Sequence, residues 1–355
     1  MFASSTPVPV GPRTSMRPPE VMLHLPLIPF ETMMSPFDFG GVICSRYVAP
    51  MRMRVVGSSD LVVSIVGLGC NNFGSRIDAA AAHEVVDAAI GAGITFFDTA
   101  EMYSDGQSEL FLGAALSGRR EQVVIATKFG WGTGPLQTDA APGSRDYIRA
   151  AVDGSLERLR TDYIDLYQYH RPDGITPIEE TLGALLELVS EGKVREIGSS
   201  NLSAQQVANA DEVARHRTFA RFISAQNHYS WLEREIERDL VPVCEQLKIG
   251  LIPYFPLARG LLTGKYHRDA PVPQGTRLSN DLDVTPETWD RLERLESFAT
   301  ARGLTLLDIA IGGLVHQPAV TSVIAGATTP QQVRANASAG NWEPTADELT
   351  ALRSL

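Results

Sequence analysis

The 355-residue chain has few cysteines, no long apolar run and no excess of positive charge. Its three cysteines, Cys44, Cys70 and Cys244, lie too far apart for a disulfide framework or a Cys-x-x-Cys metal site. No apolar run is long enough to cross a membrane. Lys and Arg number 31 against 42 Asp and Glu, and the net charge of −11 opposes binding to nucleic acid or anionic lipid. We therefore expect a cytoplasmic protein with neither kind of partner.

The first fifty residues differ in composition from the rest. They hold nine of the 22 prolines and only six charged residues. Pro26 and Pro29 interrupt the apolar segment Val21–Phe30, so it lacks the continuous stretch of a secretory signal. Proline also opposes the amphipathic helix of an organelle transit peptide. Residues 1–50 are predicted to be a disordered extension, and residues 51–355 a single domain.

After Met51 a regular alternation of strand and helix patterns begins. Met51–Val56 and Leu61–Ser64 predict a β-hairpin. Helical spacing of apolar residues marks Ala79–Ala92, Asp146–Arg160 and Ile178–Glu191. Eight short β-branched runs predict strands at Ile65–Leu68, Thr95–Phe97, Val123–Thr127, Ile164–Tyr169, Glu196–Gly198, Ile223–Gln226, Leu251–Tyr254 and Val323–Ala325. Eight parallel strands with helical crossovers indicate an α/β fold, a (β/α)₈ TIM barrel with an N-terminal hairpin.

Motifs of other enzyme classes are incomplete. The segment from Gly67 to Gly74 has its third glycine two positions too late for a dinucleotide-binding open sheet. Gly260–Tyr266 is one residue short of a phosphate loop, and His83–Asp87 lacks the second histidine of a zinc-protease helix. No Gly-x-Ser-x-Gly elbow is present. Hydrolase, kinase and zinc-enzyme chemistry are therefore not expected, and no metal site is predicted.

Four chemically distinct side chains follow neighbouring predicted strands. Asp98, Lys128 and His170 each stand directly at a strand end, and Tyr103 lies five residues after Asp98. The carboxyl ends of barrel strands converge on one rim, so these groups are expected to meet. An ammonium beside a phenol is expected to lower the phenol's pKa from about 10, and a carboxylate would hold the ammonium in place. Tyr103 then exchanges a proton with a carbonyl or alcohol oxygen, His170 orients that oxygen, and a nicotinamide must supply the hydride.

At these residues the sequence resembles the aldo-keto reductase superfamily, from about Met51 to Asn336. The resemblance is carried in barrel order by Gly67-Leu68-Gly69, Phe97-Asp98-Thr99-Ala100-Glu101-Met102-Tyr103, Ala126-Thr127-Lys128-Phe129, His170-Arg171-Pro172-Asp173, Gly198-Ser199-Ser200-Asn201, Ala225-Gln226-Asn227, Pro256–Lys265 and Gly326-Ala327-Thr328-Thr329-Pro330.

The resemblance implies a catalytic tetrad of Asp98, Tyr103, Lys128 and His170. It also implies that NADP is the cofactor, with NAD as an alternative, and that a small carbonyl compound is the substrate. The family's cofactor contacts fall on Ser200, Asn201 and Gln226 for the nicotinamide amide, Tyr254 for its ring, Pro256, Leu257, Ala258, Gly260 and Lys265 for the pyrophosphate, and Gly326, Thr328, Gln332 and Asn336 for the adenosine end.

One departure concerns the 2′-phosphate of NADP. Many relatives carry Arg or Lys near Thr328, where this chain has neutral residues. Arg277, Lys265 and Arg334 are the cations expected nearby. Binding of the 2′-phosphate is therefore expected to depend on neutral hydrogen-bond donors together with the positive charges of Lys265 and Arg277.

Three functions fit the sequence. The first is NADP-dependent reduction of an aldehyde or ketone with Tyr103 as general acid. The second is NAD(P)-dependent oxidation of a sugar or pyridoxal-type alcohol. The third is a cofactor-sensing regulator like the potassium-channel β-subunits, in which Asn replaces the histidine that this chain keeps as His170. The substrate is expected to contact Asn72, Phe73, Trp131 and Tyr229, and neither its identity nor the oligomeric state follows from the sequence.

Overall fold

The computed structural model describes residues 50–274 and 284–355. The predicted extension up to residue 49 and the predicted cofactor contact Arg277 lie outside the described residues. The expectations for both therefore stay predictions.

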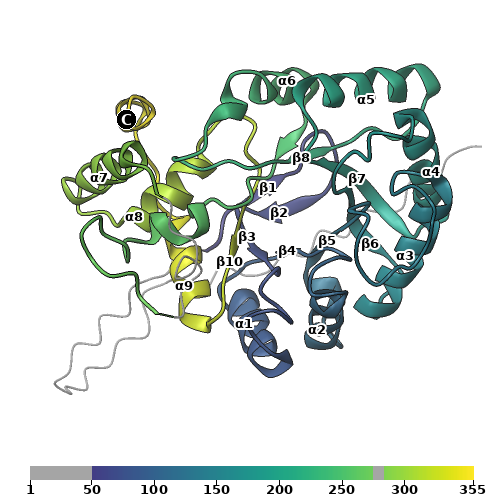
Figure 1. The fold of residues 1–355 in the computed structure, drawn as a ribbon, viewed down its shortest axis with the longest axis horizontal. Helices are drawn as coiled ribbons and strands as arrows, with labels where there is room; N and C mark the ends of the chain where they lie inside the picture. Colours follow the sequence, from purple (N-terminus) through teal and green to yellow (C-terminus); the bar gives the residue numbers. More distant parts are fainter. Residues whose placement is uncertain (1–49, 275–283) are drawn as a thin grey trace, which may run out of the picture. The chain divides into compact units, whose positions relative to one another are not determined.

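Eight parallel strands form one sheet in the order β10-β3-β4-β5-β6-β7-β8-β9. The sheet closes on itself because Leu251 forms a parallel bridge to Val320, and the Ile324 amide donates to the Pro253 carbonyl at 3.2 Å. Helices surround the strands on their outer side (Figure 1). The predicted (β/α)₈ barrel is confirmed.

The strands and helices follow the predicted order. The hairpin is β1 (Met53–Val55) and β2 (Val62–Ser64). The barrel strands are β3 (Val66–Gly69), β4 (Phe96–Asp98), β5 (Val124–Phe129), β6 (Ile164–Tyr169), β7 (Val194–Ser200), β8 (Ser224–Gln226), β9 (Gly250–Leu251) and β10 (Val323–Gly326). The α-helices are α1 (Ala79–Gly91), α2 (Gln107–Ala115), α3 (Arg145–Leu159), α4 (Ile178–Ser190), α5 (Ala204–Arg217), α6 (Leu240–Leu247), α7 (Pro286–Thr300), α8 (Leu306–Asp308), α9 (Pro330–Ala339) and α10 (Ala346–Arg353). Shorter helical turns are η1 (Arg120–Gln122), η2 (Glu235–Glu237), η3 (Ala258–Thr263) and η4 (Ile309–Gly313).

One strand is shorter than expected. The apolar run Leu251–Tyr254 predicts a four-residue strand, whereas β9 ends at Leu251. Pro253 has no N–H to donate to a neighbouring strand, and Phe255 has a φ of 52°, which extended backbone does not have. Tyr254 is therefore held by a single bridge to His228 rather than within a strand.

The interior of the barrel has an apolar lower layer. Side chains alternate across a strand, so Phe96, Ala126 and Leu166 face inward two residues before Asp98, Lys128 and Gln168. They form one buried cluster with Ile252, Ile324 and the hairpin residues Val56 and Val63. Polar groups at the carboxyl ends of the strands thus lie above an apolar plug.

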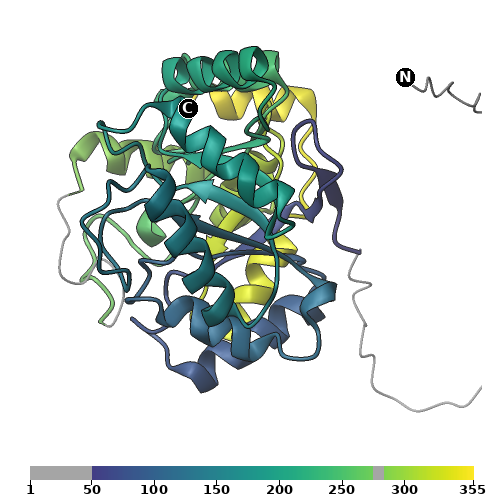
Figure 2. The same cartoon turned by 90° about the vertical axis from the view of Figure 1, so that its right-hand side faces the viewer.

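The hairpin closes the amino-terminal end of the barrel. Gly57 forms its turn with a φ of 55°, and a Cβ there would lie 2.2 Å from the Ile223 carbonyl oxygen. Such a close approach requires glycine. Arg52 donates to the Gly340 carbonyl at 2.8 Å and Arg54 to the Val315 carbonyl at 2.9 Å. The hairpin therefore lies against the C-terminal part of the chain, as Figure 2 shows.

No helix within residues 50–274 and 284–355 is both long and apolar enough to cross a membrane.

Candidate active site

Asp98 and Lys128 form a buried ion pair at the carboxyl ends of β4 and β5. The Lys128 Nζ lies 2.5 Å from Asp98 Oδ1 and also donates to the Thr99 carbonyl at 2.8 Å. Asp98 Oδ2 accepts from Gln168 at 3.1 Å and from Gln226 at 2.8 Å. A buried charge is tolerated when it is paired and its remaining lone pairs are satisfied. Both ions are therefore fixed in position.

Tyr103 reaches this pair from the turn after β4. The next three residues, Ser104, Asp105 and Gly106, all have positive φ, and the Ser104 hydroxyl donates to the Phe73 carbonyl at 2.9 Å. The turn places the Tyr103 hydroxyl 3.3 Å from Lys128 Nζ. The predicted convergence of carboxylate, ammonium and phenol is thus present in the structure.

The pKa of Tyr103 moves in the direction opposite to the one expected. Burial raises it from its ordinary value of 10.0, Lys128 lowers it, and Asp98 raises it, so that it is raised overall. The expected effect of the ammonium exists, but desolvation of the phenolate outweighs it. Burial alone would lower the pKa of Lys128, yet Asp98 and Tyr103 together raise it. At neutral pH Tyr103 therefore carries its proton and Lys128 its charge.

His170 follows β6 and completes the group. Its ring lies edge-on to the Tyr103 ring with centroids 5.9 Å apart. Burial, Lys128 and Arg171 lower its pKa well below 6.5, so the imidazole is neutral. Nδ1 is buried without a hydrogen-bond partner among the described residues. Nε2 is therefore the ring nitrogen that can bind a ligand.

Asn201 links His170 to Tyr254. Its Nδ2 donates to the His170 carbonyl at 2.9 Å, and its Oδ1 accepts from the Tyr254 hydroxyl at 2.8 Å. Its φ of 59° is left-handed, a conformation that asparagine tolerates better than most residues. Ser200 is the last residue of β7 and accepts from the same Nδ2 at 3.1 Å. One side chain thus holds the Tyr254 ring by its hydroxyl and the backbone at His170.

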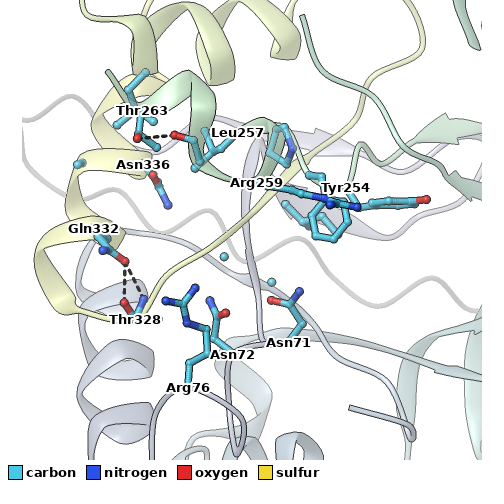
Figure 3. A pocket seen from close by; sticks show the side chains of 18 of the residues that line it. Asn71, Asn72, Arg76, Tyr254, Leu257, Arg259, Thr263, Thr328, Gln332 and Asn336 are labelled. Carbon is cyan, nitrogen blue, oxygen red and sulfur yellow. Dashed lines mark hydrogen bonds between the residues drawn. The ribbon is translucent and has the colours of Figure 1, made fainter. Parts of the chain in front are cut away.

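A cavity of about 450 Å³ opens beside the tetrad. Asp98 and Tyr103 belong to its lining, which also includes residues of the first turns of α9. Figure 3 shows the part of it between Tyr254 and Gln332. Of the predicted cofactor residues it is lined by Tyr254, Pro256, Leu257, Gly260, Lys265, Gly326, Thr328, Gln332 and Asn336. Ser200, Asn201, Gln226 and Ala258 are not part of its lining, and their predicted contacts with a nicotinamide or pyrophosphate stay predictions.

The cavity wall from Phe255 to Gly260 has an unusual backbone. Phe255, Ala258, Arg259 and Gly260 all have positive φ, between 46° and 104°. Left-handed residues beside right-handed ones direct successive N–H groups to one side, which favours an anion. Arg259 and Lys265 line the same wall and add positive charge.

Arg76 is a cavity residue that the sequence reasoning missed. It lies in the loop between β3 and α1 and lines the cavity together with Asn71 and Asn72. In Figure 3 its guanidinium approaches the cavity near Thr328, while Gln332 and Asn336 come from α9. Its position after a barrel strand was the only sequence signal. Arg334, by contrast, does not line this cavity.

The expected substrate contacts separate into two kinds. Phe73 and Tyr229 are buried, and the Tyr229 hydroxyl donates to Glu237 at 2.8 Å. They belong to the core of this structure, and their contact with substrate stays a prediction. Asn72 lines the cavity, and the Trp131 ring lies 4.6 Å from His170.

Glu101 is a buried carboxyl two residues before Tyr103. Its Oε1 accepts from the Gly130 amide at 2.9 Å and from the Tyr147 hydroxyl at 2.8 Å. Its Oε2 is buried without a hydrogen-bond partner among the described residues. Its pKa is raised overall from 4.5 to about 7. Burial is the largest cause and raises it, the hydrogen bonds from Tyr147 and Gly130 lower it, and the charges of Glu109 and Arg158 raise and lower it respectively. Glu101 thus titrates near neutrality while it joins the Tyr103 turn to the end of β5.

Glu101→Gln is expected to remove part of the pH dependence of stability. The folded state holds the Glu101 proton more tightly, so its contribution is complete below its ordinary pKa of 4.5 and is lost by about pH 7. The loss is on the order of 3 kcal/mol in the free energy of unfolding. Urea unfolding at pH 4.5 and pH 8 measures it, with the surface variant Glu84→Gln as control. Equal pH dependence in wild type and Glu101→Gln would contradict this assignment.

Comparison with known proteins places this arrangement in a family. The aldo/keto reductase family model matches residues 65–355. A probable voltage-gated potassium channel subunit beta of Oryza sativa subsp. japonica is 35% identical over 301 residues, covering 81% of this chain and 91% of the relative. The probable aldo-keto reductase 1 of Glycine max is 34% identical over 301 residues (82% and 84%), and the uncharacterized oxidoreductase YqkF of Bacillus subtilis (strain 168) is 34% identical over 309 residues (86% and 96%). The barrel, the site at its rim and these matches together show that the chain belongs to the aldo/keto reductase family of oxidoreductases.

Proposed function

We propose that the protein reduces an aldehyde or ketone to an alcohol with NADPH. The observation that carries this proposal is the Lys128 ammonium, which contacts both Asp98 and Tyr103 at the mouth of a long cavity. A charged ammonium beside a protonated phenol is suited to giving a proton to a carbonyl oxygen. Turnover of a panel of small carbonyl compounds, followed by cofactor absorbance with NADPH and then NADH, tests it.

The residues of the site divide the reaction between them. When bound, the nicotinamide supplies a hydride to the carbonyl carbon. Tyr103 donates its proton to the carbonyl oxygen, and Lys128 stabilises the phenolate that forms. Asp98 holds the ammonium in place. The neutral His170 donates a hydrogen bond from Nε2 to the same oxygen and fixes its orientation. Hydride and proton together give the alcohol.

The lining of the cavity supports an extended dinucleotide as the cofactor. The Tyr254 ring, fixed by Asn201, offers a flat surface to a nicotinamide near Tyr103. The positive charges of Arg259 and Lys265 in the Phe255–Lys265 wall would attract a pyrophosphate. The left-handed backbone of that wall would direct N–H groups toward it. At the far end a Cβ on Gly326 would lie 3.1 Å from Asn72 Nδ2, so a larger residue there would press on another residue of the cavity lining. Ser200, Asn201 and Gln226 are the proposed contacts of the nicotinamide amide.

Gln332 supports a phosphate at the adenosine end. Its Oε1 accepts from the Thr328 amide at 2.8 Å and from the Thr328 hydroxyl at 3.2 Å. The Thr328 hydroxyl is thereby engaged, so the Gln332 NH₂ group is the donor that we assign to a ligand. The first turn of α9 adds the positive end of a helix dipole. Arg76 lines the same cavity and is the cation that we assign to the 2′-phosphate.

Arg76→Ala is expected to weaken NADPH binding more than NADH binding. Two or three contacts with the 2′-phosphate should together make the wild type prefer NADPH by about tenfold to a thousandfold. A charged hydrogen bond is worth roughly 1.5–3 kcal/mol, so the variant should lose about tenfold or more of this preference. Titration of tryptophan fluorescence with both cofactors measures it, with Arg334→Ala as control. The same titration on Arg277→Ala tests the other predicted cation.

Two results would count against this assignment. Equal affinity of the wild type for NADPH and NADH would refute the preference itself. A preference unchanged in Arg76→Ala would leave NADPH in place and remove Arg76 from its explanation.

The relative from rice, which is named as a probable potassium channel subunit beta, supports a second candidate, a cofactor-sensing regulator. The presence of His170 beside Tyr103 favours the enzyme, because a regulator does not need a group that orients a substrate oxygen. Cofactor binding without turnover of any carbonyl or alcohol would favour the regulator. Faster oxidation of an alcohol than reduction of its carbonyl would favour a dehydrogenase.

A further inference from the structure

Trp131 and Arg171 form a rigid pair at the mouth of the barrel beside His170. Trp131 lies two residues beyond β5, and Arg171 directly follows His170. The Trp131 and His170 ring centroids are 4.6 Å apart. The Arg171 guanidinium lies 4.2 Å from the centre of the Trp131 ring, and its Nη2 donates to the Trp131 carbonyl at 2.9 Å. Two contacts with one neighbour therefore hold the Arg171 side chain in a single orientation.

Most N–H donors of the Arg171 guanidinium form no hydrogen bond within the described residues. It is exposed, and it forms no ion pair with any acid within residues 50–274 and 284–355. Asp173, the nearest acid in the sequence, is occupied by the Gly143 amide at 2.8 Å and the Thr176 hydroxyl at 2.6 Å. A guanidinium has five N–H donors arranged to bind carboxylate or phosphate in a bidentate manner. Arg171 is thus fixed in place without an acidic partner among the described residues, and the Trp131 ring contacts both it and His170.

We propose that Arg171 is a specificity residue that binds an anionic group of the substrate. The preferred substrates are then short aldehydes or ketones that carry a carboxylate or a phosphate a few carbon atoms from the carbonyl. This inference rests on the proposed function, because His170 must hold the carbonyl oxygen. The Trp131 indole forms the wall between the two polar ends of such a substrate.

Matched pairs of charged and neutral substrates test this inference. Succinic semialdehyde is compared with butanal, and glyceraldehyde 3-phosphate with glyceraldehyde, each with NADPH. We expect the wild type to favour at least one anionic member by about tenfold to a hundredfold in kcat/KM. Arg171→Met, which keeps an apolar contact with Trp131, should lose that preference without slowing the neutral substrate. Arg171→Lys should keep part of it. Which pair shows the preference distinguishes carboxylate from phosphate.

Arg160→Gln is the control, because Arg160 is exposed and directly follows α3 at the opposite end of the barrel. It should leave every ratio unchanged. The inference is overturned if neither anionic substrate is favoured, or if Arg171→Met slows charged and neutral substrates alike, because Arg171 would then only support Trp131 and His170.

Absence of turnover with every carbonyl would contradict the proposed function instead. In that case calorimetry with succinate and with inorganic phosphate decides the anion site separately. Weaker binding in Arg171→Met than in wild type would uphold the site. Equal or undetectable binding in both proteins would overturn it.

Discussion

Tyr103→Phe is expected to lower kcat by at least the ~10²–10⁴-fold typical of the loss of a general acid. Only the hydroxyl is removed, so the ring contact with His170 and the shape of the cavity should persist. NADPH affinity should therefore stay close to that of the wild type. Steady-state kinetics and fluorescence titration on the same preparation separate the two effects.

Tyr163→Phe provides the control for this substitution. Tyr163 immediately precedes β6, at the amino-terminal end of the barrel, where its ring lies between Arg120 and Arg195. Loss of its hydroxyl should not affect turnover. Turnover of Tyr103→Phe at the wild-type rate would refute its role as proton donor. A strong loss of cofactor affinity would show that the variant disturbs the cavity as well.

Lys128→Met is expected to impair stability and activity together. It leaves the buried Asp98 carboxylate with two glutamine donors and no cation. Removing one partner of a buried ion pair costs about 3–5 kcal/mol in the free energy of unfolding. Chemistry should also be lost, because no ammonium remains to stabilise the Tyr103 phenolate. Urea unfolding and kcat are the two measurements.

An exposed ion pair gives the matched comparison. Lys193 contacts Asp153 at 2.7 Å with about a third of its side chain exposed, and Lys193→Met should cost ~1 kcal/mol or less. The double variant Asp98→Asn/Lys128→Met should regain part of the lost stability and none of the activity. Wild-type stability of Lys128→Met would show that Gln168 and Gln226 alone satisfy the carboxylate.

Much of the barrel and its reactive rim could be predicted because two simple regularities apply. Parallel strands bring their carboxyl ends to one edge, so Asp98, Lys128 and His170 had to meet once the strands were recognised. The period of two in a strand then directs Asp98 and Lys128 inward. Tyr103 followed from a short loop that leaves little freedom of position.

Other features of the site depend on tertiary contacts and burial, which the sequence pattern does not show. Gln168 shares the inward side of β6 with His170, but a glutamine in an apolar strand gives no sign that it will donate to a carboxylate on β4. The direction of the Tyr103 pKa reflects its burial, which spacing does not reveal. Arg76 reaches the cavity from a loop that carries no motif. The family pattern near Thr328 therefore did not reveal all the positive charge that lines the cavity.

The apolar plug beneath Asp98 has a consequence for the supply of protons. Val56, Val63, Phe96 and Leu166 fill the barrel below the polar groups, and the hairpin closes that end. These four side chains carry no group that can relay a proton toward Tyr103. We therefore expect the phenolate left after each turnover to be reprotonated from the side on which substrate enters and product leaves. In the proposed reaction, recovery of the acid is thus coupled to the opening of the mouth, and a buffer too bulky to enter it should not accelerate that recovery.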